Sequence, residues 1–213
     1  IERIQQSDHP DTFELISNRI KAIRSTKSLY RSITLVGTRK NILINEGAPI
    51  HLTATLTALL NRAATSGTVI DSDVISTPQG DTVIYIVAPM RHMSGKTPVL
   101  SGFTVFCIDV HAELFPMLEQ WPIATRSGES ILLEKRLDQV VFLSELRDRK
   151  APPLSIGVPL SQSESLAVQA VLPDANGMLA GNDYRGISSL ATFRPVRGTR
   201  WTLLVSLERA EVL

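Results

Sequence analysis

The clearest pattern of hydrophobic positions lies near the C-terminal end of the chain. Residues 188–196 form a run of strand-favouring residues, and residues 201–207 form a second run that is almost continuously apolar. The short loop between them contains Gly198, and two such runs joined by a Gly-containing loop are typical of a β-hairpin. Because the second run lacks polar alternation, we expect it to be covered on both faces, in the middle of a sheet.

The same pattern occurs earlier in the chain. Residues 82–110 contain an apolar strand that ends near Pro89, a polar loop with a glycine and a long apolar strand, and a helix-like segment follows at 112–118. Upstream of each hairpin, at 32–45 and 130–144, two further strands flank a charged turn. The sequence therefore predicts one module used twice, each with the order strand, turn, strand, helix, hairpin.

Helices are predicted where apolar residues recur at spacings of three and four. Such stripes predict an amphipathic helix over residues 10–26 and a second helix over residues 51–64. A shorter helix is predicted over residues 163–172, with Ser161 or Ser163 as its cap. Helices combined with hairpins of this kind place the chain in the α+β class, with two similar modules that each have a central antiparallel sheet flanked by helices.

Proline and glycine interrupt the helical pattern between the two halves, and we place the boundary near Trp121. The predicted domains are an N-terminal helix at 1–28, a first module at 29–120 and a second module at 121–213. A chain of 213 residues is long enough for both modules to bury a core. The polar connection at 65–80 is long, and such loops often shape a pocket.

Composition and motifs argue against several classes of function. The net charge is +1, the aromatic content is 5%, and no basic stripe is interleaved with aromatics, so we expect no nucleic-acid partner. The sequence has no Gly-x-Ser-x-Gly, no phosphate-binding loop and no His-Glu-x-x-His, so we expect neither an enzyme nor a cofactor. The histidines lack metal-ligand spacing, and Asp71-Ser72-Asp73 lacks the glycine and distant glutamate of a calcium loop, so no metal site is predicted.

The single cysteine and the apolar content bear on the setting of the chain. Cys107 lies inside an apolar strand, so we expect a buried small side chain without an intrachain disulfide. No apolar run approaches the roughly 18 residues of a membrane-spanning helix. Because the chain begins at Ile1 without a methionine and stops at Leu213 within a helical pattern, we expect it to be a piece of a longer protein.

Two stretches of the second half resemble a known family. Residues 128–147, GESILLEKRLDQVVFLSELR, and 182–211, NDYRGISSLATFRPVRGTRWTLLVSLERAE, are similar to the membrane-proximal module of double Cache sensor domains. These are the tandem PAS-like extracytoplasmic regions of bacterial histidine kinases, diguanylate cyclases and chemoreceptors. The most specific pieces are Asp-Tyr-Arg-Gly at 183–186 and Arg-Pro-Val at 194–196, and residues 81–109 resemble the final hairpin of the distal module.

The resemblance implies the periplasmic sensing region of an inner-membrane signalling protein, such as one of a two-component system. A long N-terminal helix would rise from the membrane, the distal module would bind a small molecule, and the proximal module would return the chain to a second membrane helix. The membrane helices and the output domain would lie outside this chain, and a homodimer through the first helix is also implied. The alternative is an interaction or dimerisation module that responds to a protein partner without a small ligand.

Five residues of the distal module are candidate ligand contacts. They are Tyr85, Arg91 and Asp109, with Arg62 and Asp73 as weaker candidates. Asp109 matches the position where amino-acid-binding members of the family hold the ligand's amine, while Arg91 suits a carboxylate and Tyr85 offers a hydroxyl. Structural alternatives are a core position for Tyr85, a solvated charge for Arg91 and a helix cap for Asp109. Residues 61–67 lack the aromatic and arginine motif of the amino-acid-binding members, so we expect an organic acid or amine rather than an α-amino acid.

Overall fold

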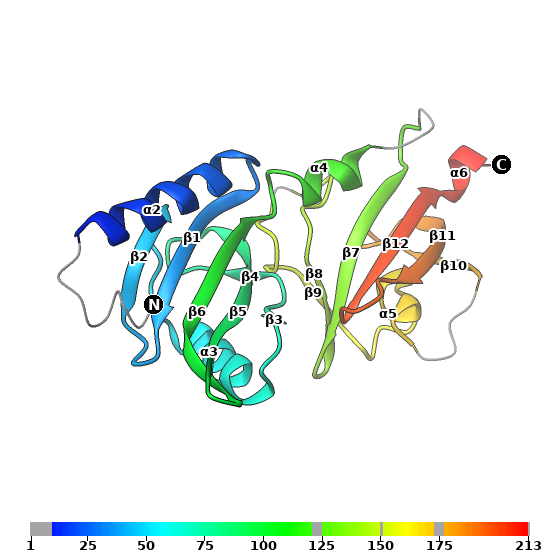
Figure 1. Ribbon diagram of the computed structural model, residues 1–213. Coiled ribbons are helices and arrows are strands. Elements are labelled where there is room, and N and C mark those ends of the chain that lie inside the picture. Colours follow the sequence, from blue (N-terminus) through cyan, green and yellow to red (C-terminus); the bar gives the residue numbers. More distant parts are fainter. Residues whose placement is uncertain (1–9, 121–124, 150, 173–176, 213) are drawn as a thin grey trace. The chain divides into compact units, whose positions relative to one another are not determined.

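A computed structural model describes residues 10–120, 125–149, 151–172 and 177–212 (Figure 1). The chain divides into two compact units between Ala112 and Glu113. The segment 114–119 thereby falls in the second unit, and the boundary predicted near Trp121 lies outside the described residues. Within the described residues no helix is long and apolar enough to cross a membrane.

The first unit is an antiparallel sheet with a helix on each side. Its elements are α2 (Pro10–Ser25), β1 (Tyr30–Gly37), β2 (Ile42–Gly47), α3 (Ala54–Ser66), β3 (Ile70–Asp71), β4 (Ile75–Ser76), β5 (Thr82–Ser94) and β6 (Thr97–Asp109). The strands follow the order β2-β1-β6-β5-β3, and β4 also pairs with β5. The long hairpin β5–β6 is the predicted one.

Two separate core clusters hold the helices of the first unit on opposite faces of its sheet. Ile20 of α2 packs with Ile33, Leu35 and Ile44 on one face, and α2 crosses β1 and β2 in Figure 1. On the other face the apolar stripe of α3 is buried against alternate residues of β1, β5 and β6, as strand geometry requires. Thr53 caps the start of α3 by accepting a hydrogen bond from the Leu56 amide.

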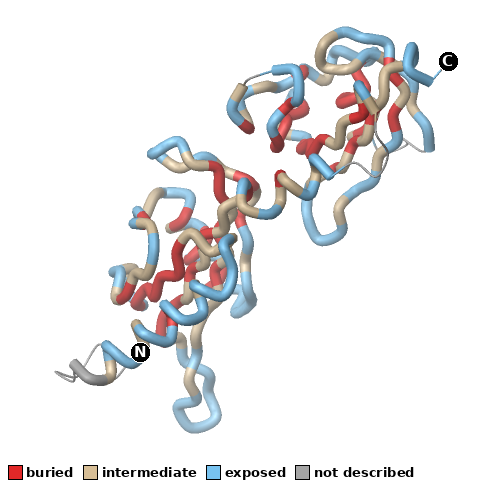
Figure 2. The backbone as a smooth tube through the Cα atoms, turned by 90° about the horizontal axis from the view of Figure 1, so that it is seen from above, coloured by how far each residue is buried: buried red, intermediate tan, exposed pale blue. Residues whose placement is uncertain are grey.

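The second unit has its own six-stranded sheet. Its elements are α4 (Leu114–Glu119), β7 (Glu129–Arg136), β8 (Gln139–Phe142), β9 (Gly157–Pro159), α5 (Leu166–Ala170), β10 (Met178–Asn182), β11 (Ser188–Pro195), β12 (Trp201–Glu208) and α6 (Arg209–Val212). The strand order is β10-β11-β12-β7-β8-β9. Leu166, Ala167 and Val168 of α5 pack on one face of this sheet with Ile131 and Leu133. In both units the buried residues concentrate along the strands (Figure 2).

The predicted repeat is confirmed by the order of the strands. Read from β8, the second sheet runs β8-β7-β12-β11-β10, and the first runs β2-β1-β6-β5-β3. In each unit the first strand therefore lies between its hairpin partner and the last strand. The second sheet differs by β9, which is added beside β8. The two sheets with flanking helices confirm the α+β class.

Several local predictions need correction. The helix predicted over 163–172 is shorter, because α5 starts after Ser165, so capping by Ser161 or Ser163 is wrong. The connection at 65–80 is not wholly irregular, because β3 and β4 within it pair with β5. Strand β5 also continues well past Pro89, since its pairing with β6 resumes after a register shift at Met90. Cys107 is buried, as predicted.

Candidate functional site

The first unit contains a cavity of about 130 Å³ on the side of the sheet that faces α3. Tyr85 and Cys107 line it and belong to the same buried cluster as Leu56 and Leu60 of α3. The other lining residues come from the start of β1 and from the segments on either side, namely Arg31, Ser32, Ala48, Pro49, Ile50, His51, Thr53, Thr77, Pro78, Gln79 and Asp81.

Strand register brings the inner wall of this cavity together. Cys107 on β6 lies opposite Ser32 of β1 on one side and opposite Tyr85 of β5 on the other. Residues directly opposite each other on neighbouring strands point to the same face, so the three side chains form a row across the sheet. Burial raises the pKa of Tyr85 to about 12, helped by the neighbouring Cys107, so its phenol stays a neutral hydrogen-bond donor.

A small charge cluster lies at the mouth of the cavity. Arg31 forms an ion pair with Asp81, and its Nη1 lies 3.9 Å from Oδ2 of Asp109. The side chains are about one-third exposed, at 31% for Arg31, 34% for Asp81 and 29% for Asp109. A charged group of a ligand can therefore reach Arg31 or Asp81 from solvent and exchange partners with them.

Of the five predicted contacts, the structure brings Tyr85 and Asp109 to this region. Tyr85 lines the cavity, and Asp109 at the end of β6 approaches it through Arg31. Asp109 Oδ1 also accepts a hydrogen bond of 2.9 Å from the His111 amide and so closes a local turn. The helix cap considered from the sequence is wrong, because α4 begins only at Leu114. The turn and the approach to Arg31 are compatible, since the two carboxylate oxygens face different partners.

The other three predicted contacts lie elsewhere. Arg91 donates a hydrogen bond of 3.0 Å to the Ala64 carbonyl near the C-terminal end of α3, a position that favours a cation. Arg62 is exposed on α3, and Asp73 is half-buried between β3 and β4. None of these three is among the described residues that line the cavity.

Sequence reasoning missed Arg31, Asp81 and His51. Arg31 and Asp81 each stand at the polar edge of an apolar strand, where a charge is ordinarily solvated. The pair spans 50 positions of sequence, and only the sheet order, which places β6 between β1 and β5, brings them together. The sequence did contain a signal. A positive charge, Arg31, stands at the start of one predicted strand, and a negative charge, Asp81, stands at the start of another.

Two hollows lie among the described residues of the second unit. The hollow on the α5 side holds only about 10 Å³, because Phe142, Leu166 and Leu204 fill it. A cavity of about 690 Å³ lies between α4, the start of β7 and residues 144–152. Neither unit contains, among its described residues, a group of three metal-binding side chains.

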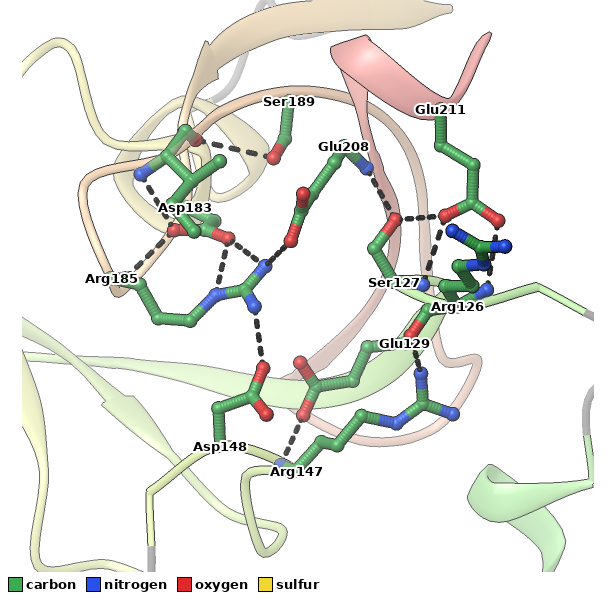
Figure 3. Close-up of polar contacts among 12 residues, drawn as sticks. Arg126, Ser127, Glu129, Arg147, Asp148, Asp183, Arg185, Ser189, Glu208 and Glu211 are labelled. Atoms are coloured by element: carbon green, nitrogen blue, oxygen red, sulfur yellow. Dashed lines mark hydrogen bonds and ion pairs between the residues drawn. The ribbon is translucent and has the colours of Figure 1, made fainter.

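A network of charges surrounds Arg185 in the second unit (Figure 3). Its guanidinium bonds to Asp183 at 2.6 Å and 2.9 Å, to Glu208 at 2.8 Å and to Asp148. It also lies 5.6 Å from the ring centre of Tyr184. Burial by itself would lower the pKa of Arg185, but the hydrogen bonds and charge of Asp183 outweigh it and raise the pKa. The Asp-Tyr-Arg-Gly motif at 183–186 is therefore a structural anchor of this unit.

The C-terminal helix α6 is attached to the same region through Glu211. The Glu211 carboxylate accepts hydrogen bonds from the backbone amides of Arg126 at 2.8 Å and Ser127 at 2.9 Å. The Ser127 hydroxyl in turn accepts a bond of 3.0 Å from the Glu208 amide. These bonds, visible in Figure 3, connect the start of β7 with the end of β12 and with α6.

Comparisons with solved structures identify proteins of the same fold. The ligand-binding domain of the amino acid chemoreceptor PctB of Pseudomonas aeruginosa PAO1, in complex with L-Arg, matches 96% of this chain and 75% of its own, at 15% identity and a TM-score of 0.62. The corresponding domain of PctC, in complex with GABA, matches 97% of this chain and 86% of its own, at 16% identity and a TM-score of 0.63.

A third likeness comes from a different kind of receptor. The extracellular domain of mmHK1S-Z2, described as a histidine kinase, matches 99% of this chain and 85% of its own, at 13% identity and a TM-score of 0.65. No protein-family model matches the sequence, and neither does any sequence of a curated protein. At these identities the likenesses concern the fold alone, and they agree with the predicted α+β architecture of two modules.

Proposed function

We propose that this chain is the extracytoplasmic input domain of a bacterial transmembrane signalling protein, and that it senses a small molecule in the first unit. Two kinds of support converge. The fold is shared with ligand-binding domains of chemoreceptors and with extracellular domains described as parts of histidine kinases. The first unit has a cavity with charged groups at its mouth. The domain itself carries out no catalysis in this proposal.

The observation that carries the proposal is the Arg31–Asp81 ion pair beside Tyr85 and the cavity. A cavity of about 130 Å³ is several times the roughly 10–15 Å³ that one buried water needs, so a molecule of a few heavy atoms fits. A ligand carboxylate would take the place of Asp81 as the ion-pair partner of Arg31. A ligand amine would take the place of Arg31 as the partner of Asp81. Both modes favour an organic acid or an amine, with Asp109 as the second carboxylate available to an amine.

Signalling requires the ligand to bind one arrangement of the protein better than another. A ligand that binds both arrangements equally shifts no equilibrium. Exchange of the Arg31–Asp81 pair supplies such a difference, because the pair links the start of β1, directly after α2, to the start of β5. We propose that this change is passed to the terminal helices.

The first experiment is thermal unfolding of the protein with a panel of small molecules. The panel holds acetate, succinate, GABA, putrescine, L-arginine and L-asparagine, each at millimolar concentration. A compound at about a hundred times its Kd adds roughly 2.7 kcal/mol to stability, which is a clear rise in Tm. The hit is then tested against Asp81→Asn, Arg31→Gln and Tyr85→Phe. Arg39→Gln, at the exposed turn between β1 and β2, is the charge-matched control away from the cavity.

The outcomes of this panel separate the two binding modes. Loss of binding in Arg31→Gln with retained binding in Asp81→Asn supports a carboxylate ligand, and the reverse supports an amine. Wild-type affinity in all three cavity variants removes the assignment of the site. The predictions for Arg62, Asp73 and Arg91 are tested in the same way by their own amide or alanine variants.

A second candidate function is a module that responds to a protein partner without a small ligand. One observation favours it, namely that Phe103 and its neighbours fill most of the space beneath α3 and leave only the small cavity. This alternative predicts no Tm shift with any member of the panel and a shift only with the partner.

A further inference from the structure

The proposed function does not explain the cavity of about 690 Å³ in the second unit. Its volume falls within the roughly 300–1,000 Å³ that is typical of small-molecule sites. Its walls are α4, the start of β7 and the segment that follows β8, and all of its lining residues belong to the second unit.

The cavity exists because α4 is short. In the first unit, α2 is a helix of 16 residues that covers β1 and β2. In the second unit the helix before the first strand has six residues and contacts β7. Ile131 and Leu133 of β7 point towards α5, so the alternate residue Ser130 faces the side of α4, and it lines the cavity. The face that α2 fills in the first unit is therefore partly open in the second.

The lining combines an apolar floor with two guanidinium groups. Phe115 and Leu118 of α4 and Leu146 supply the apolar surface. Arg147 donates one bond of 2.8 Å to the Arg126 carbonyl, which leaves most of its donors unused. Arg149 has no ion-pair partner among the described residues. An apolar surface beside guanidinium groups that keep unused hydrogen-bond donors suits a carboxylate with a hydrocarbon body.

Three glutamates also line this cavity, and two of them are engaged. Glu129 accepts a hydrogen bond of 2.7 Å from the Arg147 amide and another from the Tyr184 hydroxyl. Burial raises the pKa of the Glu129 carboxyl. Glu145 has a further interaction of its own, and Glu119 is exposed at the end of α4. The arginines are therefore the charges best placed for a ligand.

We propose that the second unit holds a separate binding site for a small organic anion with an apolar body. Its carboxylate is held by Arg147 and Arg149, and its hydrocarbon part lies against Phe115, Leu118 and Leu146. This site goes beyond the proposed function, which places the ligand in the first unit. It does not depend on that function, because the two cavities lie in different units.

The site lies beside the groups that hold the C-terminal helix. Arg147 and Glu129 line the cavity, and the next residue, Asp148, binds Arg185 (Figure 3). Arg185 binds Glu208, and the Glu208 amide reaches Ser127, which contacts Glu211 of α6. An anion bound to Arg147 therefore acts on the same segment that this hydrogen-bonded network fixes.

The test is a titration of the ¹⁵N-labelled protein with hexanoate, followed by amide NMR spectra. We expect shifts at Glu129, Leu146 and Arg147 that saturate at millimolar concentration. Hexylammonium, which has the same chain length and the opposite charge, should leave these amides unchanged. Arg149→Gln should weaken hexanoate binding at least about tenfold, because a charge-assisted hydrogen bond is lost. Arg197→Gln, an exposed turn variant with the same charge change, is the matched control.

Each alternative outcome has a defined meaning. Shifts confined to Arg31, His51 and Asp81 would overturn the second site and at the same time support the first. Stronger shifts with hexylammonium, undiminished binding by Arg149→Gln, or no shift at about 20 mM hexanoate would each overturn the proposal. Leu118→Trp, which fills the cavity without removing charge, should also abolish binding, and its amide spectrum reports whether the second unit is still folded.

Discussion

The two units share one strand order and yet differ in where their cavities lie. In the first unit the cavity lies on the α3 face, and α2 closes the other face with Ile20. In the second unit α5 and its neighbours close the equivalent face, and the large cavity lies on the side of α4. The repeated strands therefore specify the scaffold, while the length of the helices decides which face stays open.

The charged clusters of the two units also differ, in how far they are open to solvent. In the first unit Arg31, Asp81 and Asp109 lie at the mouth of a cavity and are about one-third exposed. In the second unit Arg185 is enclosed by Asp183, Asp148 and Glu208, with the Asp183 side chain only 6% exposed. The first cluster can exchange partners with a ligand, whereas the second is satisfied internally and links β12 to the segments around Asp148 and Asp183.

The contrast between α2 and α4 is tested most strongly by truncating one side chain of each. Ile20→Ala should destabilise the first unit by about 2–4 kcal/mol, because it empties a packed interface. Leu118→Ala should destabilise the second unit by less than about 1 kcal/mol, because it only widens an open cavity. Urea unfolding followed by circular dichroism measures both, and similar losses in the two variants would mean that α4 seals its face as α2 does.

The structural role of the Arg185 network predicts the next largest effect. Arg185→Met should destabilise the second unit by about 2–3 kcal/mol, because Asp183 is left with an unpaired charge. Trp201 lies on β12 of this unit, and the sequence has no tryptophan before residue 121, so tryptophan fluorescence during urea unfolding does not report the first unit. The exposed Arg194→Met is the control, and an equal effect of the two variants would show that the network adds nothing beyond hydrophobic contact.

Glu129, which lines the large cavity, should make the stability of the second unit depend on pH. Burial raises the pKa of this carboxyl above its ordinary value of 4.5, so the folded state holds the proton more tightly than the unfolded state. The resulting cost is absent below that value and is complete once the pH exceeds the folded pKa. Glu129→Gln should therefore have a higher Tm than the wild type at pH 7 and the same Tm below about pH 4. A lower Tm at pH 7 would show that the hydrogen bonds of the carboxylate outweigh its burial.

The contribution of Glu211 to stability should depend on pH with the opposite sign to that of Glu129. It is the smallest effect that we expect. Its hydrogen bonds from the Ser127 hydroxyl and the Arg126 amide hold its pKa below 4.5, so its contribution exists above that value and is lost as the pH falls through the folded pKa. In Glu211→Gln the amides of Arg126 and Ser127 should exchange hydrogen faster than in the wild type at pH 7. The difference should vanish in acid, and protection unchanged at pH 7 would mean that α6 is held by other contacts.

Much of the fold was predictable because the repeated apolar runs at 82–110 and 188–207 are long and uninterrupted. Tyr85 was predictable as a polar side chain on such a run, and Asp109 as a charge at its end. The cavity itself was not, because Arg31 and Asp81 meet only through a sheet order in which β6 separates their strands. Arg91 illustrates the converse, since its sequence position suggested a ligand contact while the structure places it at the end of α3.

Hydrophobic periodicity alone determined that this chain forms two similar α+β modules, since alternation and helical spacing are local properties that any strand or helix must satisfy. Tertiary structure decided where the modules are open and which charges are paired. Both depend on residues far apart in sequence: the six residues of α4 leave a face that the sixteen of α2 would fill, and Arg185 meets Asp148 and Glu208 from two other parts of the chain. Volume and charge pairing are properties of the assembled elements, and no local pattern encodes them.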